Sequence, residues 1–526
     1  MSQLDGLVPV INAHLPQLKQ LGVISIRPGY QLKDDWPTQQ PAIVVVVSQQ
    51  AGKVNLPASI DGILVDVRTA SAVEELRFQD PDKFNTIVQH HVEFRGGAFP
   101  EVDPAAGDEE VGAQSEADFG AADLMRGAPK KPQIPYTPAD QPLVPITGKI
   151  SILCHASPDA GWPTLSRFLA GVESTLTVGM YDFTSKHILD AVVQDLKDKQ
   201  SLELVLDHPT KNPTADQTDP ETVATLSDDL GDEFKQAWAL VRTNKEIKEY
   251  IYPSAYHIKV AVRDSSSAWV SSGNWNNSNQ PDMDPIGSPS AGDQALARKS
   301  DRDWHVIVSD PDIAKQFEAY IKHDFDIASA EEAEAERGIQ AETEIPDEFR
   351  SAATGTFQFH EPLLITDEEL TIIPLLTPDP GSYRPRMLEF IESATSKLYI
   401  QLQYIHPPKD GVDEDFKALI DAVIQKIADK LDVRIICSQF QAMQGWLERL
   451  QDTGVDLGKV KIQNGVHNKG FVVDGKKVAL GSQNWSGDGV LRNRDASVII
   501  ESQTAAEYYE TIFLHDWNRI ARQSMG

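Results

Sequence analysis

The sequence predicts an α/β protein in which one domain type occurs twice, preceded by a small N-terminal α/β domain. Three observations lead to this fold class. Strand-like and helix-like segments alternate along the chain, the second half repeats the segment order of the first, and two acidic stretches separate the folded units. We expect each half to contain a mixed sheet flanked by helices, with the functional site at the interface between the halves.

Composition and charge narrow the class of protein. The 526 residues carry 48 basic and 79 acidic side chains, a formal net charge of −31, and 40% are hydrophobic. That hydrophobic fraction is ordinary for a globular chain, and the length suggests about three or four domains at roughly 150 residues each. A negative protein repels polyanions unless its positive charge is gathered in one cleft. A non-specific nucleic-acid coat protein is therefore disfavoured.

Neither a membrane span nor a secretory leader is expected. The longest purely aliphatic run, residues 42–47, is far shorter than the about 20 apolar residues of a membrane helix, and the N-terminus lacks a basic region followed by an apolar one. The two cysteines, Cys154 and Cys437, are too few for a disulfide framework or a Cys-rich zinc site. We expect a cytoplasmic protein without an integral membrane segment, and transient contact with a membrane surface stays open.

Residues 1–95 are predicted to form the small N-terminal α/β domain. Residues 8–21 have helix-like apolar spacing, and residues 23–27, 42–47 and 62–67 have the β-branched composition of strands. No motif in this domain carries chemistry, so its role stays open.

Residues 96–146 are predicted to be an acidic, Pro-rich linker. No basic residue lies between Arg95 and Arg126, whereas eight acidic residues do. Such a composition cannot bury enough apolar surface to fold. Residues 330–350 form a second acidic segment, which we expect to connect the two halves.

Residues 147–329 and 351–526 are predicted to be the two halves of a duplicated domain. A strand-like segment at 176–183 resembles another at 398–405, and in each half it follows a Ser/Thr-Pro-Asp tripeptide and an amphipathic helix. Towards the end of each half, a strand that opens with Asp is followed by a His-Asp-aromatic tripeptide. One insertion in the first half, around residues 281–296, accounts for the difference in spacing. Self-similarity on this scale indicates an internal duplication.

Each half contains the same spaced set of polar side chains: a His-x-Lys, then an Asp, then a Ser-x-Asn. The first set is His257, Lys259, Asp264, Ser272 and Asn274, and the second is His467, Lys469, Asp474, Ser482 and Asn484. Residues two apart on a strand point to the same face. Asp474-Gly475 is a hairpin signal that would bring the Ser-x-Asn segment back beside the His-x-Lys strand. Each half thus gathers an imidazole, an ammonium, a carboxamide and a hydroxyl group.

Two such sets facing each other have the chemistry of a phosphate site. Lysine supplies positive charge, asparagine and serine supply neutral hydrogen-bond donors, and histidine can attack phosphorus or move protons. The doubled spacing H-x-K-x4-D-x6-G-S-x-N resembles the double signature of the phospholipase D superfamily over about residues 147–525. The second copy matches fully. The first has Ser271 where the family usually has Gly, which implies an altered loop geometry.

The resemblance implies a duplicated phospholipase D-like domain that breaks a phosphodiester without a metal or a cofactor. By analogy with the family, His257 is the nucleophile that forms a phosphohistidine. His467 then protonates the leaving oxygen and activates water, or an alcohol in a transfer reaction. The reverse assignment of the two histidines stays open. Lys259 and Lys469 are expected to stabilise the charge of the transition state. Contacts with the phosphoryl oxygens are further expected from Asn274, Asn484, Ser272 and Ser482.

The carboxylates divide into two pairs. Asp264 and Asp474 lie seven residues after their histidines, an odd spacing that turns them away on a regular strand, so we expect them to stabilise the hairpin turns. Asp303 and Asp495 open later strand-like runs and are better candidates to hold a catalytic imidazole in one tautomer. The family commonly has an acidic residue at that place.

Three functions stay open at this point. The favoured one is a phospholipid phosphodiesterase that hydrolyses or transfers the phosphatidyl group, although no amphipathic helix with a basic face is visible. The alternative is a nuclease acting on DNA or RNA, for which a basic tract is lacking but a narrow cationic cleft would suffice. A minor alternative is a non-catalytic module that binds phosphate or a protein. The oligomeric state is not indicated.

Overall fold

The structure is a computed structural model of the whole chain. It describes residues 4–33, 36–49, 54–70, 74–75, 78, 138–197, 200–207, 216–242, 248–250, 255–329, 357–379, 382–409, 411–442 and 445–523. Most of the predicted 96–146 linker and all of the 330–350 connector lie outside the described residues.

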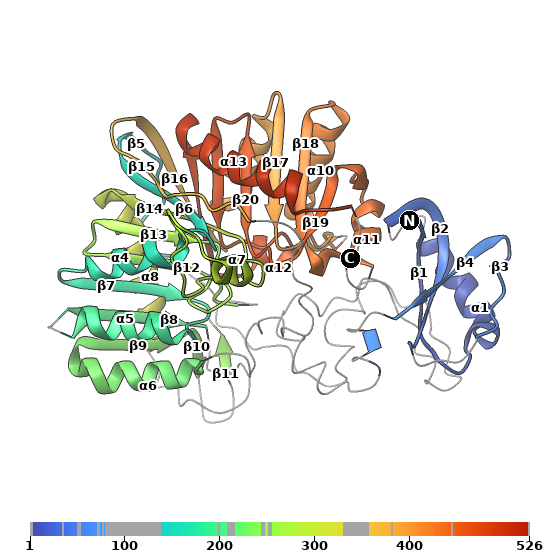
Figure 1. Cartoon of the computed structure of the whole chain (residues 1–526), viewed down its shortest axis with the longest axis horizontal. Helices are drawn as coiled ribbons and strands as arrows, with labels where there is room; N and C mark the ends of the chain where they lie inside the picture. Colours follow the sequence, from blue (N-terminus) through green and yellow to red (C-terminus); the bar gives the residue numbers. More distant parts are fainter. Residues whose placement is uncertain are drawn as a thin grey trace.

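Among the described residues, a four-stranded sheet and helix α1 make up most of the N-terminal unit (Figure 1). Its elements are α1 (Val8–Leu18), β1 (Val23–Lys33), β2 (Trp36–Val47), β3 (Ser59–Ile60) and β4 (Ile63–Thr69). Strands β1 and β2 form a long antiparallel hairpin, β4 adds parallel to β2, and β3 pairs antiparallel with β4. Helix α1 buries Ile11 and Leu18 in one apolar cluster with Ile26, Ile43 and Val45 of the sheet.

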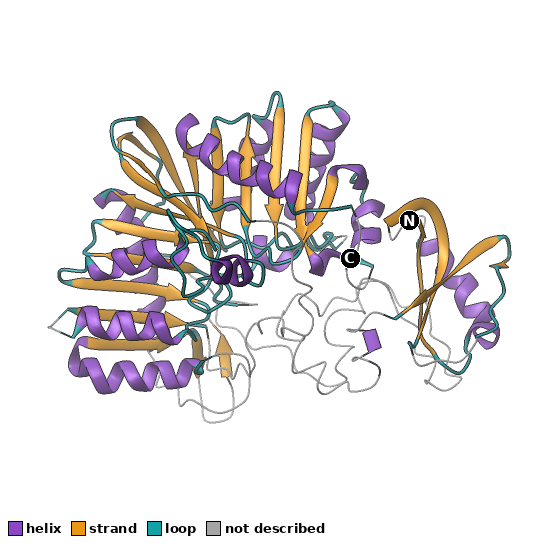
Figure 2. Ribbon diagram, in the orientation of Figure 1, coloured by secondary structure: helices purple, strands orange, loops and turns teal. Residues whose placement is uncertain are grey.

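The first half is built on an eight-stranded mixed sheet (Figure 2). Its strands are β6 (Ser151–Ser157), β7 (Thr175–Met180), β8 (Ser201–Leu206), β9 (Phe234–Trp238), β12 (Lys259–Arg263), β13 (Ser267–Ser271), β14 (Asp303–Ser309) and β15 (Leu363–Ile365). They are arranged in the order β15-β6-β14-β13-β12-β7-β8-β9. Strands β7, β8 and β9 run parallel to one another, and the other neighbours pair antiparallel.

The second half repeats this sheet strand for strand. Its strands are β5 (Ile146–Lys149), β16 (Glu369–Thr377), β17 (Lys397–Leu402), β18 (Asp432–Ser438), β19 (Val460–Gln463), β20 (Lys469–Val473), β21 (Lys477–Gly481) and β22 (Asp495–Glu501). The order is β19-β18-β17-β20-β21-β22-β16-β5, again with a parallel trio at one end. Two matching mixed sheets and a small N-terminal unit confirm the predicted fold class.

Each half contributes an edge strand to the sheet of the other half. Strand β5 lies at the start of the first half in the chain but pairs antiparallel with β16 of the second sheet. Strand β15 follows the first half but pairs antiparallel with β6 of the first sheet. The predicted halves, residues 147–329 and 351–526, are therefore interlocked in space through these edge strands. Their boundaries stay a prediction.

Helices cover the outer face of each sheet. Helices α4 (Gly161–Ala170), α5 (Lys186–Leu196) and α6 (Asp219–Leu230) pack on the first sheet. Helices α9 (Tyr383–Glu392), α10 (Glu414–Ala428) and α11 (Trp446–Asp452) pack on the second. Helices α8 (Pro311–Ser329) and α13 (Gln503–Arg519) contribute to a core that both halves share. The short elements are α7 (Ala291–Ala297), α12 (Gly487–Leu491), β10 (Leu240–Arg242) and β11 (Lys248–Tyr250).

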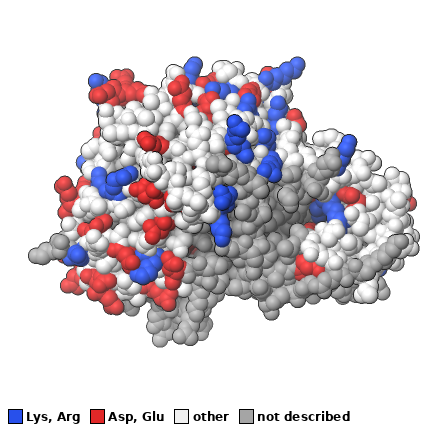
Figure 3. Space-filling model, viewed as in Figure 1, with Lys and Arg blue, Asp and Glu red and all other residues white. Residues whose placement is uncertain are grey.

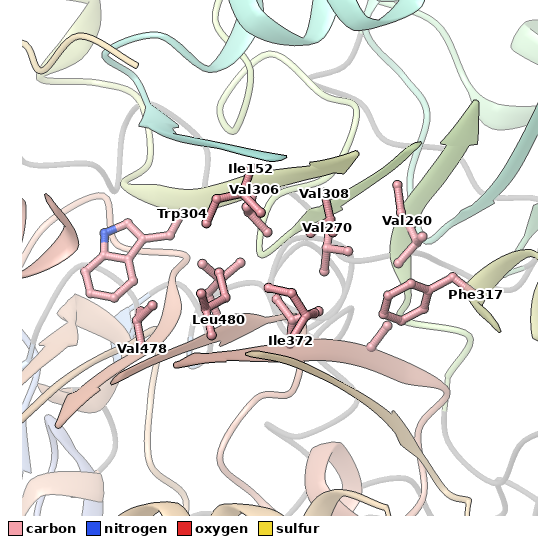
Figure 4. Packing of buried hydrophobic residues seen from close by; sticks show 14 of the residues in the cluster. Ile152, Val260, Val270, Trp304, Val306, Val308, Phe317, Ile372, Val478 and Leu480 are labelled. Carbon is pink, nitrogen blue, oxygen red and sulfur yellow. The ribbon is translucent and has the colours of Figure 1, made fainter. Parts of the chain in front are cut away.

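The inner faces of the two sheets meet in this shared apolar core (Figure 4). Val260 and Val270 point into it from the first sheet, and Val478 and Leu480 point into it from the second. Trp269, next to Val270 in the chain, points to the opposite face and packs with the helices there. Because each sheet is buried on both faces, its strands are largely apolar. The packing fixes the two halves against each other.

The N-terminal unit docks on helix α11 of the second half (Figure 1). Glu448 of that helix binds Arg27 at 2.9 Å and Arg68 at 3.0 Å, and Trp446 packs into the apolar core of the N-terminal unit. Burial raises the pKa of Glu448, but the two arginines outweigh burial and hold that pKa below its ordinary value. The contact is thus a buried, fully charged ion-pair cluster.

In the part of the chain that is described, every helix is too short or too polar to cross a bilayer. Cys154 and Cys437 are buried free thiols. Burial raises the pKa of Cys154 to about 12, so this thiol is un-ionised and unreactive at neutral pH.

Candidate active site

Each motif histidine lies on a segment that pairs with a segment of the other half. His257 stands two residues before the start of β12, and His467 stands two residues before the start of β20. The amide of His257 donates to the carbonyl of Arg494 at 2.7 Å, and the amide of His467 donates to the carbonyl of Arg302 at 3.1 Å. The main chain of each histidine is thereby held by the other half.

Each imidazole also contacts a carboxylate from the opposite half. His257 Nδ1 lies 2.7 Å from Asp495 Oδ1, and His467 Nδ1 lies 3.0 Å from Asp303 Oδ1. Both aspartates are fully buried at the first residue of β22 and of β14. A carboxylate at Nδ1 favours the tautomer with the proton on that nitrogen and turns Nε2 to the other side for chemistry. The imidazole–carboxylate pairs are therefore crossed between the halves.

Asp303 is held ionised by its surroundings. Burial raises the pKa of Asp303, but His467, through its charge and its hydrogen bond, and the charge of Lys469 outweigh burial. The pKa of Asp303 consequently lies below its ordinary value. An ionised carboxylate can accept a hydrogen bond from the Nδ1–H group of His467 and stabilise an imidazolium there.

The two motif lysines lie beside their own histidines in nearly solvent-free positions. Lys259 Nζ donates to the carbonyl of His257 at 2.8 Å, and Lys469 Nζ lies 3.0 Å from Nε2 of His467. The ring of Tyr181 lies 5.1 Å from Lys259 Nζ and 4.9 Å from the His257 ring. Positive charge in a desolvated site acts strongly on an anion. Among the described residues, no cluster of three or more His, Cys, Asp or Glu could hold a metal ion.

The Ser-x-Asn segments follow directly after β13 and β21, and their serine hydroxyls are buried against the neighbouring strands. Ser272 Oγ donates to Asp303 Oδ1 at 2.7 Å, and Ser482 Oγ accepts the amide of Ala496 at 3.0 Å. These bonds tie both serines to the strands that begin at Asp303 and Asp495. Contact of these serines with substrate, which the motif predicts, stays a prediction.

The asparagines of the same segments lie in tight, buried loops. Asn274 and Asn484 are each followed by a fully buried tryptophan, Trp275 and Trp485. Each tryptophan is bridged to the chain segment that follows β7 or β17. The asparagines are thereby fixed at the same ends of the sheets as the histidines and lysines.

Ser271, where the first motif copy departs from the family pattern, contacts a residue that the second half lacks. Ser271 Oγ lies 2.7 Å from His305 Nδ1. The second half has Ser497 in place of His305 on the equivalent strand, and a Cβ at Gly481 would collide with Ser497. Burial lowers the pKa of His305 to about 4, so a neutral imidazole can bond with the hydroxyl. Each copy therefore has a matched pair at this place.

Comparison with known proteins gives the family. The chain matches the family described as "cardiolipin synthase, PLD-like domain" over residues 165–325 and 387–517, more than half of its length. The chain belongs to this phospholipase D-like family. One matched segment falls in each half, which confirms the resemblance that the doubled motif predicted.

Similar proteins match over shorter stretches. Phospholipase D from Rickettsia felis is 33% identical over 102 residues, 19% of this chain and 47% of that protein. Phospholipase D from Rickettsia conorii is 34% identical over 98 residues, with 18% and 47% covered. The chain thus spans about half the length of these curated relatives.

Two solved structures are similar to this chain at low identity. Phosphatidylserine synthase from Haemophilus influenzae has a TM-score of 0.48 and 14% identity, covering 71% of this chain and 88% of that one. Nuc from Salmonella typhimurium, a phospholipase D family member, has a TM-score of 0.23 and 22% identity, covering 29% and 97%.

Sequence reasoning missed three residues that lie beside the two motif histidines. Arg302 and Arg494 directly precede Asp303 and Asp495, so the repeated Arg-Asp dipeptide was an available signal. Tyr181 follows β7, and the equivalent residue after β17 is Gln403. Because this position differs between the halves, comparison of the repeats could not reveal it.

The motif aspartates lie at the hairpin turns, at the far ends of β12 and β20 from the histidines. Asp474 accepts the amides of Ser396 and Lys397, each at 2.9 Å. Asp264 makes the corresponding bond with the amide of Ser174 at 2.8 Å. Both aspartates have a φ of 53°, in the left-handed region that tight hairpins require. These carboxylates tie each turn to the start of the neighbouring strand.

The Asp474→Asn variant should lose stability and keep its catalytic rate. Burial raises the pKa of Asp474, but main-chain and hydroxyl donors outweigh burial and hold that pKa below its ordinary value of 3.8. The stabilisation is therefore complete above that value and is lost as the pH falls through the lower, folded-state pKa. Because the carboxylate is partly solvated, we expect a loss of roughly 1 kcal/mol in the free energy of unfolding. Thermal melts at pH 7 and pH 3, with activity measured in parallel, check this result. A large fall in rate at unchanged stability would instead place Asp474 in the reaction.

Proposed function

We propose that the protein is a phosphodiesterase that works through a phosphohistidine on His257. The observation that carries the proposal is the crossed arrangement of His257 with Asp495 and His467 with Asp303, at 2.7 and 3.0 Å. Two imidazoles, each with a carboxylate at Nδ1, provide one nucleophile and one general acid–base group.

The first step transfers the phosphoryl group to His257. Nε2 of His257 attacks phosphorus and forms the P–N bond, while Asp495 holds the Nδ1 proton. The P–O bond to the alcohol breaks with its electron pair on oxygen. That oxygen takes a proton from Nε2 of His467, whose Nδ1 proton is held by Asp303. A neutral His257 and a protonated His467 begin this step.

The second step returns both histidines to their starting states. His467, now neutral, takes a proton from water through Nε2 as the water oxygen attacks phosphorus. The P–N bond then breaks with its electron pair on Nε2 of His257. An alcohol in place of water gives a transferred phosphodiester by the same movements of protons and electrons. His467 thus acts as the acid in the first step and as the base in the second, while His257 is first the nucleophile and then the leaving group, as microscopic reversibility requires.

Charge on the transferring group is stabilised by the lysines and asparagines. Lys259 and Lys469 supply positive charge from nearly solvent-free positions, where it acts more strongly than in water. Asn274 and Asn484 supply amide donors without adding charge. For the buried serines of the motif we propose a positioning role, because Ser272 donates to the carboxylate of Asp303.

A phospholipid is the substrate that we propose. The matched family is described as cardiolipin synthase, and the similar Rickettsia proteins are named phospholipase D. The net charge of −31 disfavours a long polyanion. On the face in Figure 3, acidic groups gather over the first half, and Lys and Arg are interspersed with them over the second. Unlike a long polyanion, a single phosphodiester bound at the two lysines does not need an extended basic surface.

Parallel assays with three substrates test this function. The purified protein is incubated in excess EDTA with phosphatidylcholine vesicles, single-stranded DNA and bis-p-nitrophenyl phosphate. We expect release of the lipid headgroup and of p-nitrophenol, with the DNA left intact. DNA cleavage without lipid turnover would show a nuclease instead. No turnover of any substrate would contradict the proposed chemistry.

A further inference from the structure

Two fully buried arginines connect the halves beside the histidines. Arg302 and Arg494 stand directly before Asp303 and Asp495, and neither side chain is exposed to solvent. Burying a guanidinium is costly unless carboxylates pair with it. A buried arginine therefore needs carboxylates placed around it, and the reaction steps proposed above assign no role to either arginine.

Arg302 binds carboxylates from both halves. In its own half it pairs with Asp159 and donates to the carbonyl of Ser157 at 2.9 Å. From the second half, Asp516 on α13 accepts from Nε at 2.9 Å and from Nη2 at 3.3 Å, a two-point contact that suits the planar guanidinium. Burial lowers the pKa of Arg302, but the two carboxylates raise it above its ordinary value. The side chain is therefore a permanent cation shared by the halves.

Arg494 repeats the arrangement with the halves exchanged. It pairs with Asp379 of its own half and donates to the carbonyl of Thr377 at 3.2 Å. From the first half, Asp324 on α8 binds it at 2.7 Å. These carboxylates belong to the Ser/Thr-Pro-Asp and His-Asp-aromatic tripeptides, which the sequence repeats in both halves. The clusters explain why these tripeptides occur twice.

The same arginines hold the histidine segments through their main chains. The amide of Arg302 donates to the carbonyl of Gly465 at 2.7 Å, and its carbonyl accepts the amide of His467 at 3.1 Å. Arg494 makes the corresponding two bonds to the segment of His257, at 2.9 and 2.7 Å. A shift of either arginine therefore disturbs the main chain of a histidine and also that of the aspartate that contacts it.

We propose that Arg302 and Arg494 are positioning residues that set the alignment of the crossed pairs. Arg302 aligns His467 with Asp303, and Arg494 aligns His257 with Asp495. This inference rests on the proposed function, because it assigns each arginine to one step of that reaction. A displacement of about 1 Å can cost about 10²-fold in rate, so a loosened arginine should slow only the step of the histidine that it aligns.

Variants that keep the volume of these side chains test the proposal. Asp324→Asn and Asp516→Asn weaken the bond from the opposite half and leave the arginine its partner within its own half. Arg494→Lys and Arg302→Lys keep the charge but lose the planar guanidinium, whose several N–H groups reach partners in both halves. The burst rate and the steady-state rate of p-nitrophenol release from bis-p-nitrophenyl phosphate are measured for each variant, together with the melting temperature.

Two different kinetic defects are expected. Asp324→Asn and Arg494→Lys should lower the burst rate by about 10- to 100-fold, because they misplace the nucleophile. Asp516→Asn and Arg302→Lys should keep the burst and lower the steady-state rate by a similar factor, with phosphohistidine accumulating at His257. p-Nitrophenolate leaves without a proton, so the first step of this substrate does not need His467.

The Lys397→Met variant is the matched control, since it removes the ion pair between Lys397 of β17 and Glu510 of α13. It should keep both rates. Equal losses of both rates in all four test variants, in proportion to the fall in melting temperature, would overturn the proposal and leave the proposed function standing. If the lysine variants do not fold, the two asparagine variants decide. An unmodified and inactive wild-type protein would overturn the proposed function and this inference with it.

Discussion

The His467→Ala variant should release about one p-nitrophenol per chain from bis-p-nitrophenyl phosphate and then nearly stop. The leaving p-nitrophenolate needs no proton, so attack by His257 can proceed without a general acid. Hydrolysis of the phosphohistidine does need His467, because water must lose a proton as it attacks phosphorus. Loss of that base should slow the second step by about 10²- to 10⁴-fold. Stopped-flow absorbance measures the burst amplitude and both rates.

Two further variants complete this prediction. His257→Ala should lose the burst and the steady-state rate together, by about 10⁴-fold or more, because the nucleophile is gone. His14→Ala is the control: it removes a histidine that lies in the N-terminal unit, 2.9 Å from Asp61, and should leave both rates unchanged. A burst that persists in His257→Ala and disappears in His467→Ala would exchange the two assignments.

The Asp495→Asn variant should slow the first step, as loss of His257 does. The Asp303→Asn variant should slow the second step, as loss of His467 does. Each aspartate contacts the histidine of the opposite half, at 2.7 and 3.0 Å. A carboxamide at Nδ1 permits the wrong tautomer, which costs about 10⁴-fold in the serine protease triad. Asp495→Asn should therefore lower the burst rate, whereas Asp303→Asn should keep the burst and lower the steady-state rate.

Double variants distinguish crossed pairs from pairs within one half. Adding Asp303→Asn to His467→Ala should cost little more, because residues that act as a unit are not additive. The control is Asp474→Asn, which changes a carboxylate at a hairpin turn of the same half as His467. If Asp303→Asn instead abolished the burst, Asp303 would act on His257, and the crossed arrangement would not govern the reaction.

The duplicated fold could be predicted because two parts of the sequence resemble each other. The order of strands, helices and motifs recurs in both halves, and each half forms the same eight-stranded sheet. The exchange of β5 and β15 was not predictable. These edge strands span only Ile146–Lys149 and Leu363–Ile365, too short for a periodic pattern, and their partners lie in the other half.

The chemical groups of the site were predictable, but their pairing was not. Spacing along the chain identified His257, His467, Asp303 and Asp495 as members of one site. The same spacing is compatible with pairs inside one half or across the interface. Only the packing of the two sheets through their shared core decides between these arrangements. The bond of Ser272 to Asp303 was not predictable either, because it depends on how β13 and β14 align.

The buried arginines show another limit of sequence reasoning. The repeated Arg-Asp dipeptide marks Arg302 and Arg494 as recurring residues. It does not predict that they are buried, because charged residues are rarely buried unless they are paired. Their carboxylate partners come from four separate segments, two in each half. The repeated tripeptides were visible in the sequence, and the structure supplies the contacts that explain them.

The position of the covalent adduct tests the central claim most directly. The His467→Ala protein is mixed with bis-p-nitrophenyl phosphate in EDTA, quenched in alkali, where phosphohistidine is stable, and digested for peptide mass spectrometry. The expected result is a p-nitrophenyl phosphoryl group on the peptide of His257 and an unmodified peptide of His467. An adduct on His467 in the His257→Ala protein, or no histidine adduct in a protein that still turns over, would contradict the proposed reaction.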